Sequence, residues 1–377
     1  MPSPVNARQP PRLTLLIPGL LWPNPALQDT VFDLPLPALQ KLLGRSRIER
    51  RTMDEAAWWN TLLDAPLSPL TRGAGGVAMS SPERQSPFNP GHESGLPAAP
   101  LRLLGLDVAP GDDVWLCADP VHLRFDQQTL LLDDPDSLML SDAECAALVA
   151  ELAPLLAEFG ELHVTANKRW HLRLKVAAPP TPALLTDLIG QPAQALLPEG
   201  AEHRPWRRLF NEVQMALHQH PVNLAREAAG QPVVNSLALW GAGRLPQPAH
   251  GAAAAGFNSI ASDQPFHRGL ARHLGLTAES ATEGYAPYPG HRLAVCPQLL
   301  VPTRFRDAMG WREGLKALEQ QWFAPALAAL GQGRLQSLHL VGFGVDDHRP
   351  TCLTASTTRG DNWKFWLGPR PLTELHP

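Results

Sequence analysis

The sequence has few of the features that would suit it to a membrane or to nucleic acid. Its 377 residues carry a net charge of −4, and no basic run is long enough to attract a polyanion strongly. No apolar segment approaches the ~18 residues that a membrane span needs. The stretch Leu13 to Trp22, LTLLIPGLLW, is split by Pro18 and Gly19 and has no convincing cleavage site after it, which favours a buried first strand over a signal peptide. We therefore expect no nucleic-acid partner and no membrane association.

Cysteine is also scarce, and its placement is informative. The four cysteines lie far apart, and none forms a CxxC pair. Cys117 and Cys296 fall inside apolar runs, where a thiol usually serves as a small buried hydrophobe. This usage fits a reducing compartment, and we expect a cytoplasmic protein. Proline, in contrast, is abundant at 40 residues, which predicts stiff loops and few long continuous helices.

The common catalytic signatures are missing. The chain has no Walker loop, no GxSxG nucleophile elbow and no HExxH zinc motif. Gly241-Ala242-Gly243 lacks the third glycine of a dinucleotide fingerprint, and it comes too late in the chain for the first strand of such a fold. Nucleotide binding is therefore not expected.

What the sequence does contain is an alternation of strand and helix patterns. Strands alternating with helices predict an α/β fold with a mostly parallel sheet covered by helices on both sides and with antiparallel hairpins added. Residues 68–100 are rich in Pro, Gly and Ser and read as a lid or a linker. We expect a strand-helix region over residues 1–100 and one compact unit over residues 101–377. The basic cluster Arg45 to Arg51, RSRIERR, is more typical of a solvated helix face than of an anion site.

The stretch from Trp206 to Pro246 carries the densest group of polar side chains between clear structural signals. It predicts an amphipathic helix interrupted at Pro221, a short helix, a buried strand over Val233 to Trp240, and a glycine loop. In an open α/β sheet such a loop lies where ligands bind. The residues of this stretch that we predict to bind a ligand are Asn211, Gln214, His218, Asn223, Arg226, Glu227, Asn235, Gly241 and Gly243. The alternative is that the polar ones form a structural hydrogen-bond network.

Two further segments have residue types that suit binding. Asp119 and His122 follow an apolar strand-like run, and an acid at the end of a buried strand suits metal or substrate binding, although Asp119 could instead cap the turn before Pro120. The triplet Asp346, Asp347 and His348 follows another strand and offers metal-ligand types, but an exposed acidic turn explains it equally well. His218 and His220, spaced i, i+2, are weak metal ligands.

Several of these segments resemble a known family. The segments are Ala118 to Leu123, Leu209 to Met215, His220 to Asn223, Arg226-Glu227, Val234 to Leu237 and Trp240 to Pro246. They resemble the Rpf-E type bacterial regulatory proteins, which are often labelled phosphoglycerate-mutase-like. The stretch from LWGAG through HRGLARHLGL is also similar to cofactor-independent phosphoglycerate mutases of the alkaline phosphatase superfamily. The resemblance covers roughly residues 100–370 and implies an alkaline-phosphatase-like α/β/α sandwich.

The chain departs from the resemblance at the positions that carry chemistry. Active relatives hold two divalent metals with several Asp and His residues, with one Asp on the first strand, and use a Ser or Thr nucleophile. Here the first strand ends in Pro18-Gly19-Leu20, and the Asp-x-x-Gly-His pattern has no counterpart near Leu299 to Arg304.

The resemblance and these departures together imply a catalytically degenerate, regulatory protein. It would bind a small anionic ligand or a protein partner and need no cofactor. The alternative is a working metal-dependent phosphoglycerate mutase or phosphohydrolase. That enzyme would hold manganese or zinc with rearranged ligands from the set Asp119, His122, Asp263, His267, Asp346 and His348.

Overall fold

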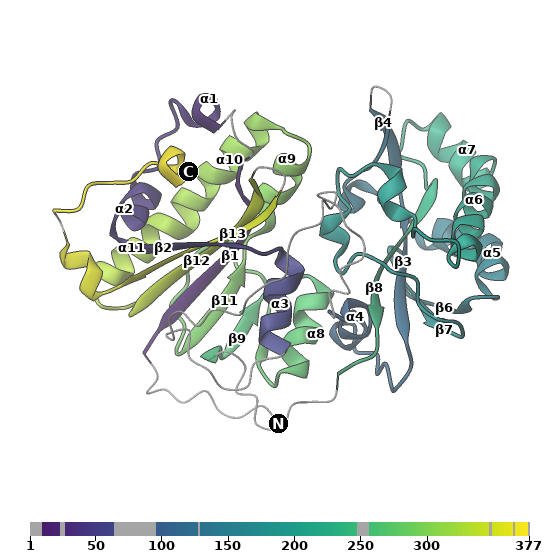
Figure 1. Ribbon diagram of the computed structural model, residues 1–377, viewed down its shortest axis with the longest axis horizontal. Coiled ribbons are helices and arrows are strands. Elements are labelled where there is room, and N and C mark those ends of the chain that lie inside the picture. The colour runs from purple at the N-terminus through teal and green to yellow at the C-terminus, as the bar shows by residue number, and fades with distance from the viewer. Residues whose placement is uncertain are drawn as a thin grey trace. The chain divides into compact units, whose positions relative to one another are not determined.

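The computed structural model describes residues 10–22, 27–63, 96–126, 129–246, 256–346, 349–364 and 366–375. The chain forms two compact units, and the second is an insertion in the sequence of the first (Figure 1). Unit 1 comprises Met1–Gly76 and Pro248–Pro377, and unit 2 comprises Val77–Gln247. This division differs from the expected boundary at residue 100, because the first strand pairs with strands near the end of the chain. Most of the predicted lid or linker, residues 68–95, lies outside the described residues.

Unit 1 is built on a seven-stranded sheet with the order β10-β9-β11-β1-β12-β13-β2. The parallel strands are β1 (Arg12–Leu21), β9 (Ser259–Ala261), β10 (Thr277–Glu279), β11 (His291–Val295) and β12 (Ser337–Asp346). At one edge, β13 (Arg349–Thr358) and β2 (Arg47–Thr52) are added by antiparallel pairing. The sheet is therefore mostly parallel, with the antiparallel β12-β13 hairpin added to it.

Helices cover both faces of this sheet. On one face α2 (Pro37–Arg45), α10 (Ala308–Leu318) and α11 (Ala324–Gly331) share an apolar core with Leu13, Leu15 and Ile17 of β1. On the other face lie α3 (Glu55–Leu63) and α8 (Pro265–His273). Ring centroids of Trp58 in α3 and Phe343 in β12 are 6.4 Å apart. The predicted fold class, an α/β/α arrangement around a mostly parallel sheet, is confirmed. The short helices α1 (Leu27–Val31) and α9 (Leu300–Arg304) complete the unit.

Two elements of unit 1 differ from the pattern in the sequence. The basic cluster predicted as a helix face ends α2 at Arg45 and forms β2 from Arg47 on, because pairing with β13 outweighs the intrinsic helix preference of arginine. The first strand runs on through Pro18 and Gly19 to Leu21. Pairing with β11 stops at Leu16, so on that side Pro18 needs no backbone donor.

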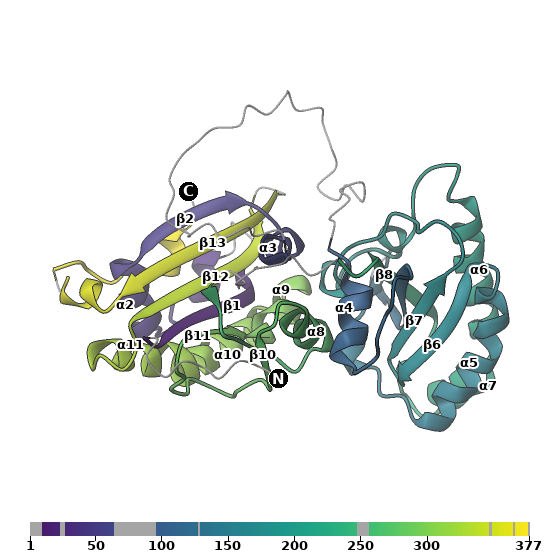
Figure 2. The same cartoon turned by 90° about the horizontal axis from the view of Figure 1, so that it is seen from below.

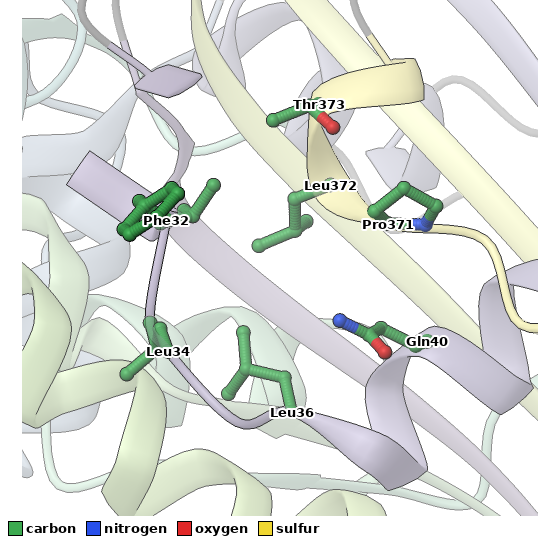
Figure 3. Close-up of a pocket in the computed structure, with 8 residues that line it drawn as sticks. Phe32, Leu34, Leu36, Gln40, Pro371, Leu372 and Thr373 are labelled. Atoms are coloured by element: carbon green, nitrogen blue, oxygen red, sulfur yellow. The ribbon is translucent and has the colours of Figure 1, made fainter. Parts of the chain in front are cut away.

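Unit 2 is centred on an antiparallel four-stranded sheet with the order β6-β7-β3-β8 (Figure 2). Its strands are β3 (Trp115–Val121), β6 (Gly160–Ala166), β7 (Arg169–Leu174) and β8 (Ser236–Gly243). One face packs on α5 (Asp142–Leu156) and α6 (Arg204–His218), and the other faces α4 (Ala98–Gly105). Helix α7 (Pro221–Ala228) follows α6, while β4 (Leu123–Asp126) and β5 (Thr129–Leu132) form a separate two-stranded sheet.

The Trp206 to Pro246 stretch has the predicted order of helix, short helix and strand, but its sheet is of another kind. Strand β8 is the edge of an antiparallel sheet, and Gly241 and Gly243 belong to this strand, so they form no loop at the carboxyl edge of a parallel sheet. Strand β3 continues through Asp119 and Pro120, where the sequence suggests a stop. Pairing with β7 ends at Cys117, which removes the need for a donor at Pro120 on that side.

The cysteines are buried and are all free thiols. Burial raises the pKa of the Cys296 thiol to about 12, so this group stays protonated and acts as an apolar side chain, as the sequence suggests. None of the helices within the described ranges is both long enough and apolar enough to cross a membrane.

Candidate functional site

In α/β proteins ligands bind at the carboxyl ends of parallel strands, so this edge of the unit 1 sheet is where a ligand is expected. Strand β1 ends in Leu20 and Leu21 and is followed by Trp22, and all three residues are no more than 4% exposed. The carbonyl of Gly19 accepts hydrogen bonds from Thr303 Oγ1 at 2.8 Å and from Trp311 Nε1 at 2.9 Å. The end of the first strand is therefore packed with apolar side chains, and these residues offer no side-chain ligand to a metal.

Strand β9 ends in a buried hydroxyl–imidazole pair. Ser262 Oγ lies 2.8 Å from His267 Nδ1 and accepts a hydrogen bond from the Gln264 amide at 3.2 Å. The His267 ring lies 4.7 Å from that of Trp59. Burial lowers the pKa of His267 to about 3, so the imidazole is neutral at pH 7. Such a weak base is poorly suited to deprotonate a serine, and the pair instead fixes the start of α8.

The ligands suggested for a rearranged metal site lie partly in unit 1, partly in unit 2 and partly outside the described residues. Asp263 is exposed and accepts a hydrogen bond from the Ala281 amide at 3.0 Å. Asp347 and His348 lie outside the described residues, as does the side chain of Asp346. Among the residues that the structure describes, no three His, Cys, Asp or Glu side chains are grouped so that they could hold one metal ion. Manganese or zinc binding stays a prediction.

Asp119 is part of a buried ion pair in unit 2. Its two carboxylate oxygens accept hydrogen bonds from Arg102 Nη1 and Nη2, the latter at 2.9 Å, and neither residue is more than 2% exposed. The same carboxylate accepts from Trp240 Nε1 at 3.0 Å and from the Trp170 amide at 2.9 Å. With four donors and 1% exposure, Asp119 belongs to the internal hydrogen-bond network of unit 2 and caps no turn, and a ligand role for it stays a prediction.

Arg102 uses its remaining donors inside the same cluster. Nε donates to His171 Nε2 at 2.9 Å, and Nη2 donates to the Trp170 carbonyl at 2.7 Å. Burial and the adjacent positive charge of Arg102 lower the pKa of His171 to about 2, which keeps it a neutral acceptor. Sequence reasoning missed Arg102. The available signal was a single charge in each of two apolar segments, AAPLRLLG and VWLCAD.

Two predicted ligand residues, Asn223 and Asn235, use their side-chain amides to form hydrogen bonds with backbone groups. Asn223 Nδ2 donates to the carbonyls of Leu217 and Val234 at 2.7 and 2.6 Å, and its Oδ1 accepts from the Val234 amide at 2.9 Å. Asn235 bonds both the amide and the carbonyl of Leu123 at 2.6 and 2.8 Å, which satisfies the edge of β4. These contacts favour the alternative of a structural hydrogen-bond network.

Arg226 is also internal. It is 2% exposed, and its Nη1 donates to Glu144 Oε1 at 2.8 Å and to the Met139 carbonyl at 2.9 Å. Glu144 completes the capping box at the start of α5 with Ser141. A hydrogen bond from the Ser141 backbone N–H has the largest effect on the pKa of Glu144 and holds it below its usual value, and the Arg226 guanidinium lowers it further. Arg226 therefore ties α7 to the start of α5.

The remaining polar residues of this stretch are accessible. Asn211 and His218 are exposed and Gln214 is half-buried, and their i, i+3, i+7 spacing places all three on one face of α6. Glu227 is exposed on α7. Whether these side chains bind a ligand stays a prediction, but they are the members of the set that a ligand could reach without unpacking unit 2.

The glycines and His122 have structural explanations. Gly241 has a φ of +67°, and a Cβ there would lie 2.9 Å from Ala98 Cβ. At Gly243 a Cβ would lie 2.7 Å from Pro97 Cβ, so both glycines allow the start of α4 to approach β8 closely. His122 Nδ1 lies 2.8 Å from the Val233 carbonyl.

We expect Asn223→Asp to lower the free energy of unfolding of unit 2 by about 1–3 kcal/mol, because a carboxylate cannot donate to the Leu217 and Val234 carbonyls. Urea titration followed by hydrogen exchange of β8 peptides would measure this loss. Asn211→Asp on exposed α6 is the matched control and should change stability by less than about 0.5 kcal/mol. Equal effects of the two variants would contradict a structural role for Asn223.

No protein-family model matches the sequence, and no curated protein matches it. Among solved structures, the chain is similar to a cofactor-independent phosphoglycerate mutase from Thermoplasma acidophilum, with 13% identity, a TM-score of 0.40, and coverage of 96% of this chain and 94% of that one. It is also similar to the PH0037 protein from Pyrococcus horikoshii, with 10% identity, a TM-score of 0.45, and coverage of 94% and 90%. Such likenesses concern the fold alone, and kinship with the Rpf-E type proteins stays a prediction.

Proposed function

We propose that this protein is a regulatory binding protein on a phosphoglycerate-mutase-like scaffold, that its catalytic metal centre has decayed, and that it binds a small anionic ligand or a protein partner. The sequence resemblance supports the scaffold. One structural observation supports the loss of catalysis: Leu20, Leu21 and Trp22 are buried where active relatives would have an acid on the first strand. Two-metal phosphoryl transfer depends on carboxylates that hold the metals.

The accessible face of α6 is the part of the predicted site best placed to meet a small ligand. Asn211, Gln214 and His218 share that face and carry amide and imidazole donors. Their side chains are not committed to the internal contacts that hold Asn223 and Arg226. Substitution of Asn211 or His218 would therefore test ligand binding without removing the buried network.

We expect the purified protein to retain much less than one equivalent of manganese or zinc after incubation with each metal and desalting. We also expect it to hydrolyse p-nitrophenyl phosphate, and to interconvert phosphoglycerates, no faster than buffer does. Elemental mass spectrometry and the two assays would measure these quantities, with a metal-dependent phosphatase as positive control.

About two retained equivalents together with turnover would overturn the proposal and support the metal-dependent enzyme. In that case Asp346→Asn and His348→Gln would test whether the segment after β12 holds the metal. A matched pair of changes, His218→Gln and His220→Gln, would test the histidines around the end of α6.

A further inference from the structure

We propose that the outer edge of β2 is the docking site for an extended, acidic segment of a partner protein, which adds one strand to the sheet of unit 1. This inference rests on the proposed binding role and specifies the chemistry of the partner. Two structural features support it: the position of β2 at the edge of the sheet and the charge of its side chains.

Strand β2 is the last strand of the seven-stranded sheet. It pairs with β13 along one side, from Arg47 opposite Ser356 to Thr52 opposite Thr351, and no described strand pairs with its other side. Figure 2 shows β2 at this margin of the sheet. The backbone groups along such a margin can form a ladder with an incoming strand, which is a common mode of peptide recognition.

The side chains of β2 select a partner by charge. Strand β2, Arg47–Thr52, contains three arginines and one glutamate, a net charge of +2 in a chain whose total is −4. On one face of the strand, Arg47 and Arg51 contact Glu49 at 2.9 and 3.1 Å, and their side chains are 82% and 65% exposed. One carboxylate thus faces two guanidinium groups, and this face retains an excess of positive charge.

This arrangement disfavours other occupants. A second copy of β2 would place arginines near arginines, because like charges on neighbouring strands destabilise pairing. An acidic strand would instead place carboxylates opposite Arg47 and Arg51, which lie four residues and therefore roughly 13 Å apart along β2. The best partner has acidic residues spaced i, i+4 on one face and an uncharged or basic residue between them, opposite Glu49.

The test uses the full-length protein and a fluorescein-labelled acidic peptide of ten residues, EVTVEVTVEV, in which glutamates spaced i, i+4 share one face with the uncharged threonine that would lie opposite Glu49. Fluorescence anisotropy should show salt-sensitive binding, and a peptide with Gln in place of Glu should bind at least about tenfold more weakly. Arg47→Glu and Arg51→Glu should each weaken binding by about tenfold. Arg306→Glu, the same charge change at an exposed site on unit 1, is the matched control and should change affinity less than about twofold.

Two N-methylated peptides separate strand addition from attraction by charge alone. One carries N-methyl groups at odd positions and the other at even positions, so only one of them keeps the backbone donors that face β2. Strand addition predicts that one peptide loses at least about tenfold in affinity and that the other does not. Equal affinities, or no binding of the acidic peptide, would overturn the inference. Neither outcome affects the metal and phosphatase tests, so the two proposals can fail separately.

Discussion

Asp119→Ala will lower the free energy of unfolding of unit 2 by about 3–5 kcal/mol, because it leaves the Arg102 guanidinium buried without its counter-charge. The loss includes the hydrogen bonds that the carboxylate accepts from Trp240 and from the Trp170 amide. Urea titration read by hydrogen exchange of β3 and β7 peptides measures it specifically in unit 2.

The matched controls are a double variant and a surface ion pair. Arg102→Met combined with Asp119→Leu removes both charges and should recover much of the stability that Asp119→Ala loses. Glu161→Ala breaks the exposed contact with Arg173 and should have a far smaller effect. If Asp119→Ala were no more harmful than Glu161→Ala, the interior role of Asp119 would be refuted and a ligand role would regain support.

Acid will destabilise unit 1 well before its carboxylates are protonated. Burial lowers the pKa of His267 to about 3, and burial together with the charges of His339 and Arg12 lowers that of His291 to about 3. The unfolded chain takes up a proton near pH 6.5 at each site, whereas the folded chain does not until about pH 3. Stability is therefore complete above pH 6.5 and falls as the pH drops from 6.5 toward 3. At pH 5 the loss is on the order of 2 kcal/mol per histidine.

Urea midpoints at pH 7, 6 and 5, read by hydrogen exchange of β1 and β11 peptides, test this pH dependence. His267→Gln and His291→Gln should each make the decline shallower, although each also lowers stability at pH 7 by disturbing the contact with Ser262 or Thr14. His218→Gln, on the exposed face of α6, should leave the slope of unit 1 unchanged. Identical slopes in all three variants would show that other groups cause the acid sensitivity.

The sequence predicts the fold class because apolar patterns are strong where an element is buried. Leu13 to Ile17 is a run with one stable location, the centre of a sheet, and the structure places it there. Strand β2 could not be predicted in the same way, because RSRIERR has no strand pattern and is held by pairing with β13. The unit boundary depends on similarly distant pairing, between β1 and β11, which local pattern does not encode.

The candidate site could be predicted only in part, for a related reason. The sequence identifies Asp119, Asn223 and Asn235 as polar groups in apolar surroundings that need partners. It does not identify the partner, and a buried carboxylate paired with Arg102 has the same local pattern as one that awaits a ligand. Solvent exposure distinguishes residues that a ligand could reach from residues with an internal partner. Asn211 and His218 lie at the surface, whereas Asn223 and Arg226 are buried.

The insertion of unit 2 within unit 1 also sets the order in which the two can form on the ribosome. Unit 2 is one continuous segment, so all its strands are available once residue 247 has emerged. Strand β1 is made before unit 2, yet its contact with β11 joins Thr14 to His291, which are 277 residues apart. A folded unit 2 shortens the flexible chain between them and lowers the entropy lost when β1 and β11 meet. During synthesis the apolar segment that forms β1 therefore has no parallel neighbour to pair with until the chain beyond unit 2 has been made.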